Sequence, residues 1–158
     1  MLKTMIAFAT IAVLTASPVF ASTSDDANFP LRAEYEVVGV KPFSTQDLAS
    51  QFANFVIVDV RSDYEYHTLH IEDAQSIPLS SPNFIGQIQA LAEKTKKPIV
   101  FYCNGTTCSK SYQAGALALG HNLKNTFVYD AGIFAWAKAY PARTTLLGAA
   151  MKSDSQLI

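Results

Sequence analysis

The stretch that decides the fold is PIVFYCNGTTCSKSYQAGALALG, residues 98–120. Its apolar start, residues 98–102, has the length and composition of a buried strand. A polar segment with two cysteines follows, and from about Ser109 apolar residues recur at helical spacing as far as Gly120, which we expect at the C′ position of the helix. The stretch therefore predicts a strand, a tight loop and a helix, with Cys103 at the C-terminal tip of the strand.

A cysteine in this position is a candidate nucleophile. The free N–H groups and the positive dipole end of the following helix favour the thiolate over the thiol. The alternative is that Cys103 is an inert buried cysteine, but its place at a strand tip beside a polar loop favours the reactive interpretation. The second cysteine, Cys108, lies five positions further on.

Outside this stretch, strand-like and helix-like segments alternate along the chain. Ser44 is a plausible N-cap with Asp47 three residues later, and Pro82 suits the first turn of another helix. Strands are expected at residues 35–40, 55–60, 74–79 and 126–129, and helices at residues 44–52, 62–68, 82–94 and 133–140. This alternation predicts an α/β fold with one mostly parallel central sheet flanked by helices on both faces.

The sequence also predicts how the chain is divided into a domain and its flanking segments. One domain is expected at residues 35–142, preceded by a flexible lead-in at residues 22–34. Residues 143–158 form a C-terminal tail with no clear structural signal. The chain of 158 residues carries a net charge of −1, so nothing in its charge favours nucleic acid as a partner.

The first 21 residues have the pattern of a signal peptide. Lys3 supplies a positive n-region, residues 5–14 are apolar, and Val19-Phe20-Ala21 has the form of a cleavage site. We expect export, cleavage after about Ala21 and no membrane attachment of the mature chain, with the periplasm as destination if the source is a Gram-negative bacterium. The alternative is an uncleaved N-terminal anchor.

Export changes the interpretation of the two cysteines. In an oxidising compartment Cys103 and Cys108 are expected to pair. A disulfide that closes so small a ring constrains little of the unfolded chain, which makes it a poor structural staple. The pair is therefore interpreted as part of the chemistry of the protein, and without a nearby histidine it is a poor metal site.

Three ordered stretches of this sequence resemble the motifs of the rhodanese family in its single-domain form. Together they cover about residues 43–141, nearly all of the chain after the predicted signal peptide. The stretches are IVDVR at 57–61 with EY at 65–66 and HIEDAQSIP at 70–78, VFYC at 100–103 through Ser109, and VYDAGIFAW at 128–136 with Pro141.

The resemblance implies a rhodanese-like domain that transfers sulfane sulfur by double displacement. A Cys103 thiolate would attack the outer sulfur of thiosulfate, a polysulfide or a persulfide and become a persulfide itself. An acceptor, either a thiol or cyanide, would then remove that sulfur. No cofactor and no metal are implied.

The resemblance also gives roles to the residues of the loop. Backbone N–H groups of Asn104 to Ser109 would surround the sulfur, and Gly105 would allow the backbone to curl. The substrate-binding candidates are Asn104, Gly105, Thr106, Thr107, Ser109 and Lys110, of which Lys110 is the first cation after Cys103 in the sequence. Asp59 and Arg61 are expected to be structural supports beneath the loop.

The loop departs from the family pattern at two positions. Thr106 stands where the family has glycine, and Cys108 stands where it has an arginine thought to help bind anionic donors. Cys108 could attack the Cys103 persulfide, releasing sulfide and leaving a disulfide, or it could be where an external thiol-redox protein resets the site. A third interpretation is that Cys108 only fills space in the loop or forms a resting disulfide with Cys103.

Two other functions remain open from the sequence. One is a dithiol/disulfide redox protein that uses Cys103 and Cys108, and the other is a non-catalytic rhodanese-like binding module. A phosphatase is disfavoured, because its loop needs an arginine six positions after the cysteine and that position is Ser109.

Overall fold

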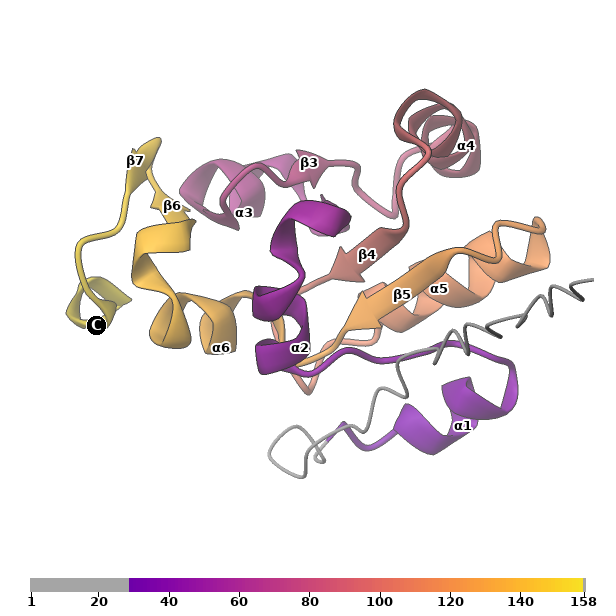
Figure 1. Cartoon of the computed structure of the whole chain (residues 1–158), viewed down its shortest axis with the longest axis horizontal. Coiled ribbons are helices and arrows are strands. Elements are labelled where there is room, and N and C mark those ends of the chain that lie inside the picture. The colour runs from indigo at the N-terminus through magenta and orange to yellow at the C-terminus, as the bar shows by residue number, and fades with distance from the viewer. Residues whose placement is uncertain (1–28, 158) are drawn as a thin grey trace, which may run out of the picture.

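A parallel sheet organises the protein, whose computed structural model describes residues 29–157 (Figure 1). Within these residues the sheet has four strands in the order β3-β1-β4-β5, and each neighbouring pair is parallel. The strands are β1 (Val56–Asp59), β3 (Gln75–Ser76), β4 (Ile99–Tyr102) and β5 (Thr126–Tyr129). The predicted α/β fold with a parallel central sheet is confirmed.

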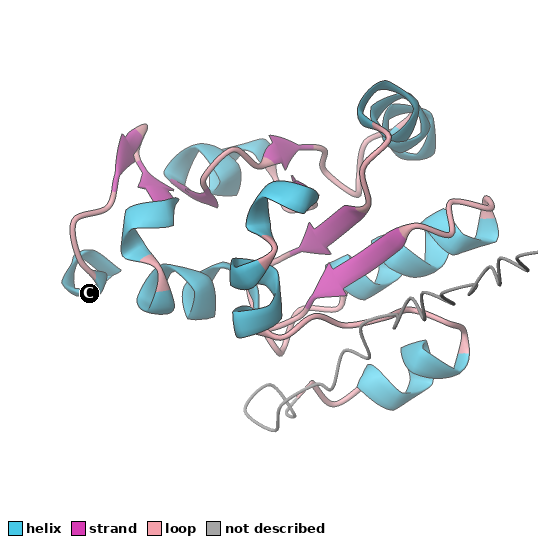
Figure 2. Ribbon diagram, viewed as in Figure 1, coloured by secondary structure: helices cyan, strands magenta, loops and turns pink. Residues whose placement is uncertain are grey.

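Helices cover both faces of this sheet (Figure 2). Helices α4 and α5 pack with Val58 and Phe101 on one face, while α2 and α6 pack with Ile57 and Val100 on the other. The helices are α1 (Arg32–Val37), α2 (Thr45–Ser50), α3 (Asp63–Thr68), α4 (Phe84–Thr95), α5 (Lys110–Gly120) and α6 (Gly132–Ala139). Every residue of β4 is buried, as expected for a central parallel strand that is covered on both sides.

A second, antiparallel sheet lies at one end of the molecule, where it joins the chain's C-terminal part to an earlier segment. Its order is β2-β6-β7, and His70 of β2 pairs with Thr145 of β6. The strands are β2 (Leu69–Ile71), β6 (Thr144–Leu146) and β7 (Ala149–Ala150), and short 3₁₀ helices occupy Phe52–Asn54, Pro141–Arg143 and Asp154–Leu157. Met151, beyond the predicted domain, is 3% exposed in the core.

The N-terminal part of the described chain differs from the expectation. The predicted strand at residues 35–40 is wrong, because Arg32–Val37 forms helix α1. Residues three apart lie on the same side of a helix, so Arg32 and Tyr35 both face helix α5. In a strand the same two side chains would point to opposite faces. Phe29, which belongs to the predicted lead-in, is 5% exposed and stacks on Tyr112 with ring centroids 4.5 Å apart.

The end of α5 also differs from the expectation. Gly120 is the last residue of the helix, so its predicted place at C′ is wrong. The left-handed residue is Asn122, with a φ of 63°, and the N–H of Leu123 donates to the carbonyl of Ala118 at 3.0 Å. Asparagine here takes the place that glycine usually has in this type of helix end.

The predicted signal peptide, residues 1–21, lies outside the described residues, as do residues 22–28 of the predicted lead-in. Within residues 29–157, no helix combines the length and the apolar character needed to cross a membrane.

Candidate active site

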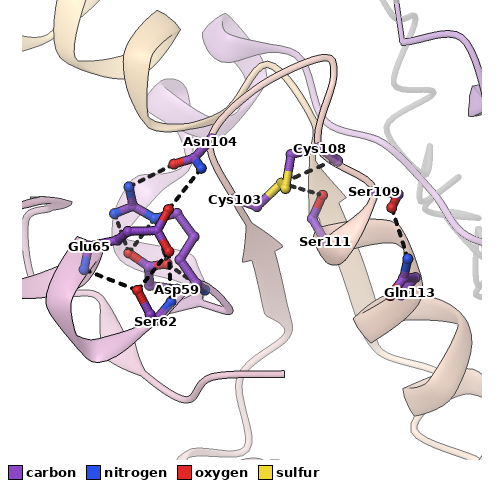
Figure 3. Close-up of a disulfide and its surroundings, with 10 residues drawn as sticks. Asp59, Ser62, Glu65, Cys103, Asn104, Cys108, Ser109, Ser111 and Gln113 are labelled. Atoms are coloured by element: carbon purple, nitrogen blue, oxygen red, sulfur yellow. Dashed lines mark hydrogen bonds and ion pairs between the residues drawn. A yellow bond between two sulfur atoms is a disulfide. The ribbon is translucent and has the colours of Figure 1, made fainter. Parts of the chain in front are cut away.

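Cys103 follows the last residue of β4 and points toward the start of α5 (Figure 3). Its side chain is fully buried. Its sulfur is joined to that of Cys108 in a disulfide, with the two Cα atoms 6.4 Å apart. The hydroxyl oxygen of Ser111 lies 3.8 Å from the Cys103 sulfur. The structure therefore shows the loop in its oxidised form, in which neither sulfur is a nucleophile.

Reduction would leave the Cys103 sulfur in a polar setting. Its Sγ lies 3.2 Å from the carbonyl oxygen of Cys108, a contact that becomes a hydrogen bond once the sulfur carries a proton. Because both sulfurs belong to one short loop, each thiol stays within reach of the other after reduction. The arrangement suits a cysteine that alternates between thiol, persulfide and disulfide.

The backbone of the loop turns so that helix α5 begins beside the cysteines. The N–H of Cys108 donates to the carbonyl of Gly105 at 2.9 Å, which closes a tight turn. Ser109 is the N-cap residue but makes no side-chain cap; its hydroxyl accepts a hydrogen bond from Gln113 instead. The first N–H groups of α5 have no partner one turn earlier in the helix, and with the helix dipole they favour negative charge at this end.

The start of α6 holds the loop from the side of β5. The N–H of Ile133 donates to the carbonyl of Cys103 at 3.0 Å. Gly132 has a φ of +73°, and a β-carbon there would overlap the backbone of Asn104. Ala131, the residue before Gly132, has an ordinary φ of −62°, so alanine fits there without strain. Of these two residues, only Gly132 lies where the geometry requires glycine.

An ion pair under the loop links it to the sheet. The carboxylate of Asp59 accepts hydrogen bonds from Arg61 at 2.9 and 2.6 Å, and the Tyr102 hydroxyl donates to it at 2.7 Å. Arg61 also donates from Nη1 to the side-chain oxygen of Asn104 at 3.0 Å, and from Nη2 to the carbonyl of Leu69. The structure therefore places Asp59 and Arg61 directly beneath the residue that follows Cys103.

Two groups of this network, Arg61 and Tyr102, have raised pKa values. Burial lowers the pKa of Arg61, but its hydrogen bonds and charge attraction to Asp59 outweigh burial and leave the pKa raised. Burial raises the pKa of Tyr102 well above its usual range, and the Asp59 charge raises it further. Arg61 and Tyr102 therefore both remain hydrogen-bond donors to Asp59.

Glu65 of helix α3 is a further residue of the site, which the sequence alone does not place beside the loop. It forms a capping box with Ser62, and it also accepts a hydrogen bond from Asn104 Nδ2 at 2.9 Å. Partial burial alone would raise the pKa of Glu65, but hydrogen bonds from Asn104 and Ser62 and the charge of Arg61 outweigh burial and lower the pKa to about 2. The S-x-x-E spacing signals the cap, whereas only the fold shows the link to Asn104.

A second buried carboxylate, Asp130, follows β5 and was also missed. It is fully buried and accepts hydrogen bonds from Arg32 Nη2 at 2.8 and 2.6 Å and from the Tyr112 hydroxyl at 2.6 Å. Burial raises the pKa of Tyr112, as does its hydrogen bond to Asp130. No sequence pattern links Arg32 to a carboxylate 98 positions away.

The remaining predicted residues differ in how they relate to Cys103. Thr107 and Lys110 are exposed, while Thr106 and Ser109 are half-buried at the loop surface. The Asn104 side chain turns away from the disulfide toward Glu65 (Figure 3). It contributes there to a pocket of about 320 Å³, together with Arg61, Tyr64, Glu65, Thr68, Leu69, Phe134, Leu146, Gln156 and Leu157. Within residues 29–157, no group of three or more metal-ligating side chains is placed to hold a metal ion.

Comparison with known families gives one match over most of the domain. A family model described as the rhodanese-like domain matches residues 44–139. This range contains both cysteines, the Asp59–Arg61 pair, Glu65 and Asp130. It does not contain Arg32.

Curated proteins with similar sequences include two named tRNA uridine(34) hydroxylase. The protein of Pectobacterium carotovorum subsp. carotovorum is 37% identical over 93 residues, covering 56% of this chain and 25% of that protein. The protein of Photorhabdus laumondii subsp. laumondii is 35% identical over 88 residues, covering 52% of this chain and 24% of that protein. The match therefore spans only about a quarter of the length of these curated relatives.

Solved structures share the fold at lower sequence identity. The rhodanese-like domain of an Anabaena protein superimposes with a TM-score of 0.57 at 22% identity, covering 71% of this chain and 84% of that one. A thiosulfate sulfurtransferase from Pseudomonas aeruginosa has a TM-score of 0.53 at 21% identity, covering 71% of this chain and 22% of that one. At these identities the likeness concerns the fold.

Proposed function

Because the chain belongs to the rhodanese-like domain family, we propose that it is a sulfurtransferase that carries sulfane sulfur as a persulfide on Cys103. The observation that carries the proposal is the position of Cys103 at the tip of β4, beside the uncapped N-terminus of α5. N–H groups and the helix dipole at that position stabilise a thiolate, and afterwards the terminal sulfur of a persulfide anion.

The proposed reaction has two displacement steps. The Cys103 thiolate attacks the outer sulfur of thiosulfate, forming an S–S bond as the bond to sulfite breaks and sulfite leaves with the electron pair. An acceptor thiolate or cyanide then attacks the terminal sulfur, and Cys103 leaves as a thiolate. A polysulfide or a protein persulfide serves as donor by the same steps.

Cys108 adds a second route for the persulfide. Its thiolate attacks Sγ of the Cys103 persulfide, forming the disulfide and expelling the outer sulfur as hydrosulfide. An external dithiol must then reduce the disulfide before another cycle, while it becomes a disulfide itself. This route would form the same disulfide that joins Cys103 and Cys108 in the structure, which supports a thiol-redox protein as a proposed partner.

Export to the periplasm remains part of the proposal, based on the pattern of residues 1–21. The alternative proposal is a dithiol/disulfide redox protein that carries no sulfur, and the Cys103–Cys108 disulfide supports it. The hydroxylation named for the curated relatives is not part of our proposal, because the aligned region is a quarter of those proteins.

The test uses the reduced chain with thiosulfate and cyanide, with thiocyanate as the product measured. Thiocyanate formation that Cys103→Ser abolishes supports the sulfurtransferase. A Cys103 that gains no sulfur from thiosulfate or polysulfide in intact-mass measurements, but cycles between dithiol and disulfide with a dithiol reagent, contradicts it and favours the redox protein.

A further inference from the structure

Asp130 and Cys103 occupy equivalent positions at the ends of two adjacent strands. Tyr102 of β4 pairs in register with Tyr129 of β5, so the residues that follow them lie at the same level of the sheet. Cys103 shares a face of the sheet with Phe101, and Asp130 shares that face with Val128, because side chains alternate along a strand. Neighbouring strands lie about 4.8 Å apart. The buried carboxylate and the sulfur therefore follow adjacent strand ends and lie on the same face of the sheet.

Without a paired cation, a carboxylate in this position would disfavour negative charge on Cys103. Like charges a few ångströms apart in a buried site raise the pKa of the group that ionises second. A negative charge on Asp130 would therefore disfavour both the Cys103 thiolate and its persulfide anion. A cation next to Asp130 removes that opposition.

Arg32 is this cation. Its guanidinium donates to both carboxylate oxygens of Asp130, from Nε at 2.9 Å and from Nη2 at 2.8 and 2.6 Å. The segment that carries it is held in place because Tyr112 stacks between Phe29 and Tyr35, with centroids 4.5 and 4.9 Å apart. Helix α1 lies beside α5 in Figure 1, as these ring contacts require.

The other buried carboxylate of the site shows what Arg32 supplies. Asp59 is paired with Arg61, two residues later in the same motif, and accepts a hydrogen bond from the Tyr102 hydroxyl. Asp130 has the same kind of surroundings, with an arginine and a tyrosine hydroxyl, but its arginine comes from outside residues 44–139. The region matched by the family model thus contains a buried negative charge, Asp130, whose arginine partner lies in the segment before that region.

We propose that Arg32 is a positioning residue of the active site, which pairs with Asp130 so that this carboxylate does not oppose the negative charge on Cys103. The role rests on the proposed function, since it concerns the thiolate that sulfur transfer needs. It makes helix α1 part of the site, although α1 contributes no group that touches a reacting atom.

Other charged groups also surround Cys103. Lys110 is exposed at the start of α5, and the Asp59–Arg61 pair lies on the opposite face of the sheet. Glu65 reaches the loop only through Asn104. All of these groups stay the same in the variants compared below, so differences among the variants report on Arg32 and Asp130.

The experiment measures the rate of alkylation of Cys103 by iodoacetamide as a function of pH. It uses the full reduced chain with Cys108→Ser as the background, which leaves one thiol. In this background, Arg32→Met should move the midpoint of the profile upward by about one pH unit, which lowers the rate about tenfold at pH values below both midpoints. Arg32→Lys keeps the charge and should leave the midpoint close to that of the background.

The double variant Arg32→Met/Asp130→Asn separates charge from structure. Removing the carboxylate should return the midpoint to the background value or below it, even though the α1 contact is lost. Lys124→Met, an exposed change of equal charge at the opposite end of β5, is the matched control and should not move the midpoint. Circular dichroism identifies any variant that fails to fold, and the double variant carries the test if Arg32→Met does so.

An unchanged midpoint in folded Arg32→Met, or a raised midpoint that persists in the double variant, overturns the proposal and leaves Arg32 a purely structural residue. Failure of the sulfurtransferase proposal looks different. In that case no variant produces thiocyanate, while the alkylation midpoints still follow the charge on residues 32 and 130.

Discussion

Arg61 Nη1 donates a hydrogen bond to the side-chain oxygen of Asn104, 3.0 Å away, and so joins a buried ion pair to the residue after Cys103. Asn104 in turn donates to Glu65 at 2.9 Å. Through these contacts the strand end at Asp59, the loop and helix α3 form one connected unit. Substitutions in this unit should therefore affect both stability and sulfur transfer.

Replacing Arg61 should destabilise the protein strongly. In Arg61→Met the fully buried carboxylate of Asp59 loses its cation, and breaking such a buried pair costs roughly 3–5 kcal/mol. Urea denaturation followed by circular dichroism measures the free energy of unfolding. Arg143→Met, which removes an exposed arginine, is the control and should cost under about 1 kcal/mol. An equal loss in both variants would show that the buried pair has no special role.

Gly132→Ala should impair both folding and activity. The β-carbon would meet the loop backbone at Asn104, and the positive φ adds strain of about 1 kcal/mol or more. The matched control is Gly148→Ala, which also has a positive φ but has open space around it. We expect both variants to lose some thermal stability, but only Gly132→Ala should lose most of the thiocyanate-forming rate. Equal rates in the two variants would contradict the role of Gly132 in seating the loop.

The lowered pKa of Glu65 predicts a pH-dependent contribution to stability. A carboxyl whose pKa is about 2 in the folded protein and near 4.5 when unfolded stabilises the fold above pH 4.5, and that contribution is lost as the pH falls toward 2. Glu65 is only half-buried, so solvent screens its charge and the contribution should stay below about 1 kcal/mol.

The measurement compares urea denaturation of the wild type and Glu65→Gln between pH 2 and pH 7. The difference in unfolding free energy should be constant above pH 5 and shrink as the pH falls from 4.5 toward 2. Glu93→Gln, the same change at an exposed carboxyl of α4, is the matched control for the substitution itself. A difference that grows on acidification would have the wrong sign for a carboxyl with a lowered pKa.

The two cysteine substitutions should separate sulfur loading from sulfide release. Reduced Cys108→Ser should load one sulfur atom from thiosulfate or polysulfide and keep it, because no second thiol can expel it. The wild type should release hydrosulfide and end as the Cys103–Cys108 disulfide. Intact mass spectrometry and a colorimetric sulfide assay distinguish these products, and Cys103→Ser should neither load sulfur nor release sulfide. Equal sulfide release from Cys108→Ser and the wild type would exclude the resolving role of Cys108.

The sequence predicts those elements of the fold whose sequence signals lie close together along the chain. The apolar run at residues 99–102, the polar loop and the helical spacing after Ser109 lie next to one another, so β4, the loop and α5 follow directly. Strands β2, β6 and β7 have two or three residues, too few for an alternating pattern, and their pairing is decided by the tertiary fold. The same limit explains α1, which depends on contacts with Tyr112 more than on its own propensity.

The candidate site divides in the same way. Cys103 and the Asp59–Arg61 pair come from short motifs, since each depends on residues within a few positions. The links from Asn104 to Glu65 and from Asp130 to Arg32 span 39 and 98 positions, so no spacing rule reveals them. Buried charges find partners wherever the fold brings a side chain of opposite sign, and that partner need not lie in the same motif.

The pairing of β2 with β6 has a consequence for where the domain can be cut. The family match ends at residue 139, yet β6, which begins at Thr144, shields the hydrogen-bonding side of β2. A fragment that stops at the end of the match would expose the edge of β2 next to the pocket that Asn104 lines. Unpaired strand edges favour pairing between molecules. The residues of β6 thus protect the domain from self-association, and a chain truncated before Thr144 should be prone to aggregate through the exposed edge of β2.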